Sequence, residues 1–361
     1  MLSPCSRAVA VTPAPKPVPA LNGVRGWAFL SVVLMHSNDF LGWRLFYVDG
    51  IAGVWLFFSL SGFLLTRQLL DEGRALWSGR VLARYFWHRF LRIYPLFGVY
   101  VVCLGLLAHV PAEKCWRVLA LSAKHGVDWS LVVECRFYLI LPLLILPWAF
   151  QAVRRFFLLW LVGITAGVVW VFPFWASESE WLGAHARALG NDMTLEALPY
   201  LSAFLPGVIA AYCASRWPFR ASAARAGYWT DCAGIVALAT FLIVPLVETS
   251  SVPGLSGRVA GWWFPYGIAY AAWLYLLASG GGGRLARALE WRFMQLLGAV
   301  SYPGYLFHIF VLFYLRRWVQ DGVWLYLGLA CIGVLGASCL LHWSVERPLS
   351  RLRWRDAGGR P

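Results

Sequence analysis

The sequence is short of charged residues. They make up 13% of its 361 residues, whereas hydrophobic residues make up 60% and the mean hydropathy is +0.64. Soluble globular proteins carry about 25% charged residues. The composition therefore excludes a water-soluble globular domain and predicts an all-α integral membrane protein, because helices satisfy their own backbone hydrogen bonds in lipid.

Several motifs are also missing. The eight cysteines form no C-x-x-C pair and do not cluster with histidines, so no metal site is predicted. The chain contains no P-loop, no G-x-S-x-G elbow, no lipidation box and no internal repeat. Acidic residues are few, 17 against 31 basic, which gives a net charge of +14. Because the arginines stand between apolar runs, we interpret this charge as a membrane-topology signal, and we expect no nucleic-acid partner.

Ten apolar segments are long enough to cross a hydrocarbon core of about 30 Å. We predict a bundle of about ten transmembrane helices at 21–40, 47–66, 93–110, 129–149, 156–175, 197–214, 229–247, 259–279, 294–315 and 322–343. Residues 1–20 are rich in proline and predict a flexible cytoplasmic lead with no cleavable signal peptide. Residues 344–361 predict a short basic cytoplasmic tail.

The basic residues predict which way the bundle faces. With ten helices, the termini and the loops on their side contain 21 lysines and arginines, and the opposite loops contain eight. Basic loops remain in the cytoplasm. Both termini are therefore predicted to be cytoplasmic.

The first apolar segment, 21–40, contains both Arg25 and His36. Eleven residues correspond to about 1,100° of helix, close to three turns, so both side chains lie on one face about 16 Å apart. An arginine in hydrocarbon costs about 2.5 to 3.5 kcal/mol and normally faces a cavity with a function. Two structural alternatives stay open: Arg25 reaches the headgroups, and His36 only hydrogen-bonds a neighbour.

Polar residues also stand in apolar surroundings in the third and fourth segments. Arg89 and Arg92 are spaced i and i+3 at the start of the third segment and predict a phosphate site, although the basic loop 67–92 also fits a topology signal. In the fourth segment, Glu134 and Tyr138 share a face, and Glu134 alternatively pairs with an arginine of another helix.

The ninth segment contains SYPGYLFH, in which Tyr305 and His308 share a face. A structural and a catalytic role for His308 both stay open. Its proline, Pro303, predicts a gap in the helix backbone.

Six stretches resemble the motifs of one family in the same order. They are LNGVRG followed by MH, FFSLSGFLL at 57–65, RFLRIYPLF at 89–97, WSLVVECRFYLILPLL, LGAVSYPGYLFH and VERPLSRL. Together they resemble the membrane-bound acyltransferase-3 proteins, which acylate surface glycans and some small molecules. The resemblance identifies 21–343 as an acyltransferase-3-like transmembrane domain.

The resemblance implies a reaction and a place for it. An acyl group, acetyl in the main expectation, would move from cytoplasmic acyl-CoA to a hydroxyl of a cell-surface or exported glycan across the bacterial inner membrane. Acyl-CoA is then a donor substrate, with no permanently bound cofactor. The chain lacks the soluble esterase-like extension of some relatives, so a second transfer step would need a separate periplasmic partner.

The resemblance also suggests roles for the polar residues. Arg25 would bind the donor, with Arg89 and Arg92 on the CoA phosphates. His36 would be the general base, acting by direct transfer or through a transient acyl-histidine. Glu134 would orient His36 or bind the acceptor, and Tyr138 would donate to the developing oxyanion.

Other readings remain open at this point. The acceptor is alternatively a small glycosylated metabolite or a lipid-linked sugar. A transporter or flippase would also place charges inside a bundle, but the sequence has no inverted repeat of helices. An inactive scaffold is disfavoured by the presence of both Arg25 and His36.

Overall fold

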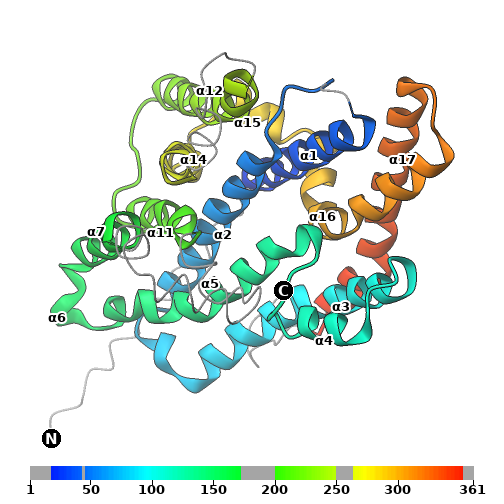
Figure 1. The fold of residues 1–361 in the computed structure, drawn as a ribbon. Coiled ribbons are helices and arrows are strands. Elements are labelled where there is room, and N and C mark those ends of the chain that lie inside the picture. The colour runs from blue at the N-terminus through cyan, green and yellow to red at the C-terminus, as the bar shows by residue number, and fades with distance from the viewer. Residues whose placement is uncertain (1–17, 43–44, 172–199, 249–262, 353–361) are drawn as a thin grey trace, which may run out of the picture.

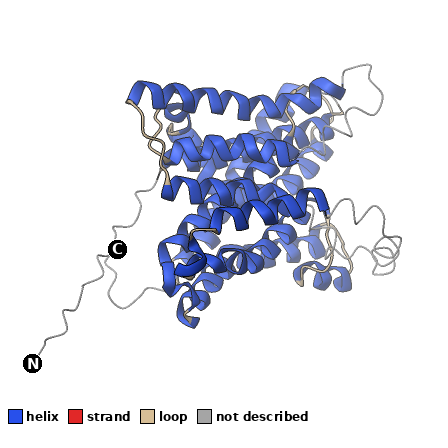
Figure 2. Cartoon of the chain, turned by 90° about the vertical axis from the view of Figure 1, so that its left-hand side faces the viewer, coloured by secondary structure: helices blue, strands red, loops and turns tan. Residues whose placement is uncertain are grey.

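The computed structural model describes residues 18–42, 45–171, 200–248 and 263–352. Within these ranges every regular element is a helix and no strand occurs (Figure 2), which confirms the all-α class for the described chain. Most of the predicted lead, residues 1–17, and the end of the predicted tail, residues 353–361, lie outside the described residues.

The helices follow one another along the chain as labelled in Figure 1, with short helical turns between some of them. The long helices are α1 (Pro19–Leu41), α2 (Gly50–Glu72), α3 (Gly79–Leu107), α5 (Trp129–Ile145), α11 (Leu201–Arg216), α12 (Ala223–Glu248), α14 (Trp263–Ala278), α16 (Arg292–Trp318) and α17 (Val323–Leu341). The shorter elements are η1 (Gly73–Trp77), α4 (Ala112–Leu119), η2 (Gly126–Asp128), η3 (Leu146–Ala149), α6 (Gln151–Arg154), α7 (Phe157–Ala166), η4 (Gly167–Val171), α15 (Arg284–Leu289), η5 (His342–Glu346) and α18 (Arg347–Ser350).

Six of the described helical stretches are long and apolar enough to cross a membrane: Gly50–Glu72, Gly79–Leu107, Gly126–Ala149, Ala223–Ile243, Arg292–Trp318 and Val323–Ser350. Two shorter apolar helices, Phe157–Val169 and Phe264–Ala278, accompany them. The chain is therefore a multi-pass membrane protein. Helix α1 is not among the six although it has 23 residues, because polar residues such as Arg25 and His36 lower its mean hydropathy. The count of ten spans and the cytoplasmic termini stay predictions.

Each of the ten predicted segments overlaps a helix, but the third begins much earlier than predicted. Helix α3 starts at Gly79, where the Ser78 hydroxyl accepts a hydrogen bond from the Val81 amide (3.3 Å). The basic region 67–92 is consequently mostly helical, and Arg89 and Arg92 lie well inside α3. The apolar run alone misplaces this boundary because arginine is a good helix former.

Helices α1 and α16 approach each other closely at glycines. A Cβ atom on Gly298 would lie 2.1 Å from the carbonyl oxygen of Asn22, and one on Gly26 would lie 2.6 Å from that of Met294. The Asn22 side-chain amide also donates to the Gln295 carbonyl (2.9 Å). Small residues at such crossings let membrane helices pack by van der Waals contact.

Helix α16 is continuous from Arg292 to Trp318, so the predicted gap at Pro303 is absent. A proline removes only one helical N–H donor. The residues on either side of it, Val300, Ser301 and Gly304, are buried against other helices and hold the helix together.

Candidate active site

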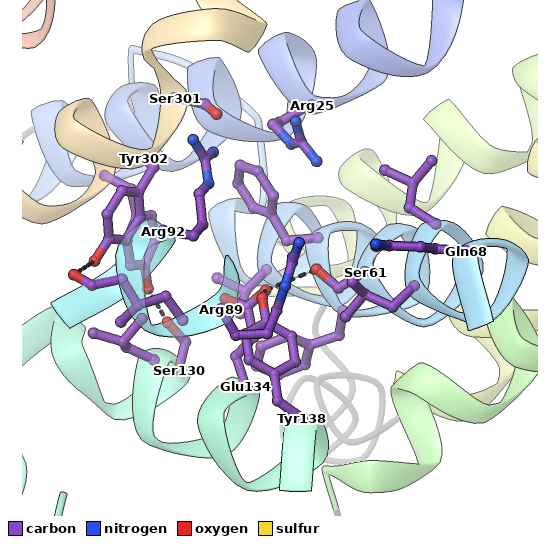
Figure 3. A pocket seen from close by; sticks show the side chains of 18 residues that line it. Arg25, Ser61, Gln68, Arg89, Arg92, Ser130, Glu134, Tyr138, Ser301 and Tyr302 are labelled. Atoms are coloured by element: carbon purple, nitrogen blue, oxygen red, sulfur yellow. Dashed lines mark hydrogen bonds between the residues drawn. The ribbon is translucent and has the colours of Figure 1, made fainter. Parts of the chain in front are cut away.

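A cavity of about 310 Å³ lies between helices α1, α2, α3, α5 and α16. Five of the six residues predicted to form the site line it: Arg25, Arg89, Arg92, Glu134 and Tyr138. Its other polar lining residues are Ser61, Gln68, Ser130, Ser301, Tyr302 and Tyr305 (Figure 3). The cavity therefore collects polar side chains from segments that are far apart in the sequence.

Two of the arginines face the cavity without an acidic partner. In Figure 3, Arg25 from α1 and Arg89 from α3 are directed toward the same space. Within the described residues neither guanidinium forms a salt bridge, and the buried Nε of Arg89 has no hydrogen-bond partner. Arg89 does lie 5.7 Å from the centre of the Tyr138 ring. Guanidinium groups that form no salt bridge at a partly apolar cavity favour an anionic ligand.

The third arginine, Arg92, is already paired. It forms a salt bridge with Glu346 of η5, whose other carboxylate oxygen lies 2.8 Å from Nδ1 of His342. Its guanidinium also lies 5.4 Å from the centre of the Tyr302 ring. Among the described residues Arg92 therefore has a salt-bridge partner, which Arg25 and Arg89 do not have.

Glu134 belongs to a small hydrogen-bond network at the cavity wall. Its carboxylate accepts hydrogen bonds from the Ser61 hydroxyl (2.8 Å) and from the Tyr138 hydroxyl. Among the described residues it forms no salt bridge with an arginine and no hydrogen bond with His36. The Tyr138 hydroxyl, which was expected to meet an oxyanion, donates to Glu134 in this structure.

His36 does not line the cavity but lies beside a second histidine. Its Nδ1 is 3.1 Å from Nε2 of His308 and 3.0 Å from the carbonyl oxygen of Val32. Tyr305 is near both the pair and the cavity: it lines the cavity, and its ring centre is 6.0 Å from that of His308. The Tyr305 hydroxyl is 2.7 Å from that of Ser130, another lining residue.

Sequence reasoning did not assign roles to several of the residues found here. Ser61 and Gln68 are seven residues apart on α2, a spacing that places both on one face and that was available as a signal. Glu346 belongs to the recognised VERPLSRL stretch, but nothing in its spacing indicates Arg92 as its partner. Within the described residues, no group of three or more histidine, cysteine or acidic side chains is placed to hold a metal ion.

The fold and the cavity define a helical, multi-pass membrane protein with a cationic internal site. The chain belongs to the acyltransferase-3 family, whose acyltransferase-domain model matches residues 18–343. The family assignment indicated by the six motifs is thereby confirmed, and the matching model is that of an acyltransferase domain.

Similar curated proteins are named for O-acetyl transfer. A Staphylococcus aureus protein named "Putative O-acetyltransferase" is 25% identical over 232 residues, covering 56% of this chain and 35% of its own length. The peptidoglycan O-acetyltransferase of Listeria monocytogenes is 30% identical over 159 residues, 36% of this chain and 24% of its own. The chain spans about a third of the length of the first of these relatives. No solved structure matches it.

Proposed function

We propose that this protein is a membrane O-acetyltransferase that moves an acetyl group from cytoplasmic acetyl-CoA to a hydroxyl of a cell-surface or exported glycan. The family and the names of its relatives support O-acetyl transfer. The observation that carries the donor assignment is the pair Arg25 and Arg89, two guanidinium groups that face one cavity without a carboxylate partner among the described residues. We place the protein in the inner membrane of a bacterium.

The charge of the cavity fits a CoA ester. CoA carries phosphate groups, and a guanidinium forms paired, charge-assisted hydrogen bonds with phosphate. Small-molecule sites measure about 300 to 1,000 Å³. A cavity of about 310 Å³ thus accommodates one part of a donor as long as acetyl-CoA, with the remainder outside.

The chemistry requires a base, and His36 is the proposed one. Its imidazole takes the proton of the acceptor hydroxyl while that oxygen attacks the acetyl carbonyl carbon. As the new C–O bond forms, the C–S bond breaks and CoA leaves as a thiolate. The thiolate then receives the proton from the imidazolium, so the products are the acetyl ester and free CoA. A transient acetyl-histidine is the alternative route.

Donor binding is tested with variants of three arginines. In the full chain in lipid vesicles, Arg25→Gln and Arg89→Gln are each expected to weaken acetyl-CoA binding at least about tenfold, since each removes one charge-assisted contact. Arg80→Gln is the matched control, because Arg80 also lies on α3 but is exposed and away from the cavity. Equal binding by all four proteins would contradict the donor assignment.

Acceptor identity is tested in cells. We expect alkali-labile acetyl esters on the surface glycan of cells with the native chain, and their loss with His36→Ala at matched membrane levels. Turnover of acetyl-CoA without glycan esters would indicate that the acceptor is a small glycosylated metabolite or a lipid-linked sugar. Retention of acetyl-CoA binding without any turnover would favour a transporter, and turnover restored only by a second protein would favour a separate transfer partner.

A further inference from the structure

The hydrogen bonds of His308 fix the position of its own proton. His308 is fully buried on α16, and its Nδ1 lies 2.8 Å from the carbonyl oxygen of Tyr305 and 3.2 Å from that of Gly304. A carbonyl oxygen only accepts hydrogen bonds. Nδ1 of His308 must therefore carry the hydrogen, and in the neutral ring Nε2 is left as an acceptor.

This acceptor faces His36. Nε2 of His308 lies 3.1 Å from Nδ1 of His36, so the His36 nitrogen must be the donor. The Val32 carbonyl oxygen, 3.0 Å from the same nitrogen, shares this hydrogen as a second acceptor beside Nε2 of His308. If Nε2 of His308 donated to His36 instead, the buried His308 ring would carry two hydrogens. A lone pair on Nδ1 of His36 would then face the Val32 carbonyl oxygen.

We propose that His308 is a positioning residue that holds His36 in the tautomer with hydrogen on Nδ1, so that Nε2 is the free, unprotonated nitrogen available to substrate. The proposal rests on the proposed general-base function of His36. It resembles the arrangement in catalytic triads, where a third group orients the base and selects its tautomer. The chain of hydrogen bonds here runs from His36 through His308 to the carbonyl oxygens of Tyr305 and Gly304.

A packing role alone does not account for a histidine at position 308. A buried imidazole costs free energy unless its nitrogens are hydrogen-bonded, whereas an apolar side chain of similar size would pack without that cost. Both ring nitrogens of His308 have hydrogen-bond partners. Nδ1 contacts the carbonyl oxygens of Gly304 and Tyr305, and Nε2 contacts His36.

The tautomer can be measured without reference to activity. The full chain is labelled with ¹⁵N-histidine and reconstituted in phosphatidylcholine vesicles, and solid-state ¹⁵N spectra distinguish protonated from bare ring nitrogens. The signals of His36 are assigned by their loss in His36→Gln. We expect hydrogen on Nδ1 in the native protein and in His308→Gln, whose amide oxygen replaces Nε2 as acceptor. In His308→Leu the form with hydrogen on Nε2 should appear beside it.

The kinetic test uses the release of CoA from acetyl-CoA by membranes that contain the acceptor. His308→Leu should lower kcat about 10- to 100-fold, the usual effect of losing a residue that orients another, with KM for acetyl-CoA unchanged. His308→Gln should recover most of that loss. Equal losses in both variants, or a native His36 protonated on Nε2, would overturn the proposal. Full activity of His36→Gln would instead refute the general-base function and leave the tautomer assignment standing.

Discussion

At the scale of single residues, the cavity is distinguished by charged side chains that extend from largely apolar helices. Arg25 and Glu134 stand out because a charged group in an apolar segment has a high cost, and Arg89 stands out because it is spaced i and i+3 with Arg92 at the start of the third segment. The structure gathers all three at one cavity. What each of them contacts depends on side chains from other helices, and spacing within one segment carries no information about those contacts.

The hydrogen bond from Ser61 to Glu134 is open to a matched test. Ser61→Ala removes a hydrogen bond to a charged group, which is worth about 1.5 to 3 kcal/mol, and should lower the thermal unfolding temperature in detergent. Ser59→Ala is the control two residues away on α2. The buried Ser59 hydroxyl has no hydrogen-bond partner among the described residues, so its removal should leave stability unchanged or higher. Similar shifts in both variants would contradict the assigned bond.

Arg25 should matter for activity and little for stability. It forms no salt bridge or side-chain hydrogen bond with the described residues, so Arg25→Gln removes no native contact of that kind. We expect acetyl transfer to fall about 10²- to 10³-fold, as when one preorganised charge-stabilising group is lost. The unfolding temperature should change by no more than a few degrees. A large drop in that temperature would indicate a structural role instead.

At the scale of elements, helix positions were predictable and helix ends were not. The ten predicted segments each overlap a helix because apolar length is a local property of the chain. The start of α3 at Gly79 was missed because its first turns are basic and amphipathic and resemble a loop in hydropathy alone. The prediction of a gap at Pro303 was wrong, because burial on both sides compensates for one missing donor.

The crossing of α1 and α16 should tolerate no side chain at Gly298. Gly298→Ala would place a methyl group 2.1 Å from the Asn22 carbonyl oxygen, which forces the two helices apart. We expect a lower unfolding temperature and loss of acetyl transfer, since α1 carries both Arg25 and His36. Gly328→Ala on α17 is the matched control, because nothing lies within 4 Å of its added methyl group. Indistinguishable behaviour of the two variants would refute the close approach.

The salt bridge between Arg92 and Glu346 should hold the C-terminal helical turn against α3. Removing one partner of a buried pair costs about 3 to 5 kcal/mol, because the other charge is left uncompensated. Glu346→Gln is therefore expected to lower the unfolding temperature strongly. Glu72→Gln, which breaks the pair of Glu72 with Arg84, should cost less, because the Glu72 carboxylate is 25% exposed and that of Glu346 only 7%. A double variant Arg92→Met, Glu346→Gln should recover part of the loss, and failure to recover any would argue against coupling.

At the scale of the whole molecule, composition determined the class, and the order of six motifs determined the family. The three-dimensional arrangement could not be predicted from the sequence, because α1 packs on α16 and Arg92 pairs with Glu346 across most of the chain. No local pattern specifies contacts at such separations. The cavity between these helices therefore depends on the fold as a whole.

The orientation of the bundle is a whole-molecule prediction that awaits measurement. The 21-to-8 bias of basic residues between the predicted loops predicts that both termini are cytoplasmic. Fusions of alkaline phosphatase to either terminus should be inactive, and fusions of a fluorescent protein that matures only in the cytoplasm should be bright. An active phosphatase at one terminus only would require an odd number of spans.

The pairing of α1 with α16 has a consequence for how the chain is made. Asn22 and its partner Gln295 are 273 residues apart. At about 5 to 20 residues per second, translation takes roughly 14 to 55 s to cover that distance. During this interval the nascent first helix must reside in the membrane with Arg25 and His36 on its surface and its final neighbour not yet synthesised. Biogenesis, and not only the finished enzyme, must therefore accommodate a charged helix in lipid.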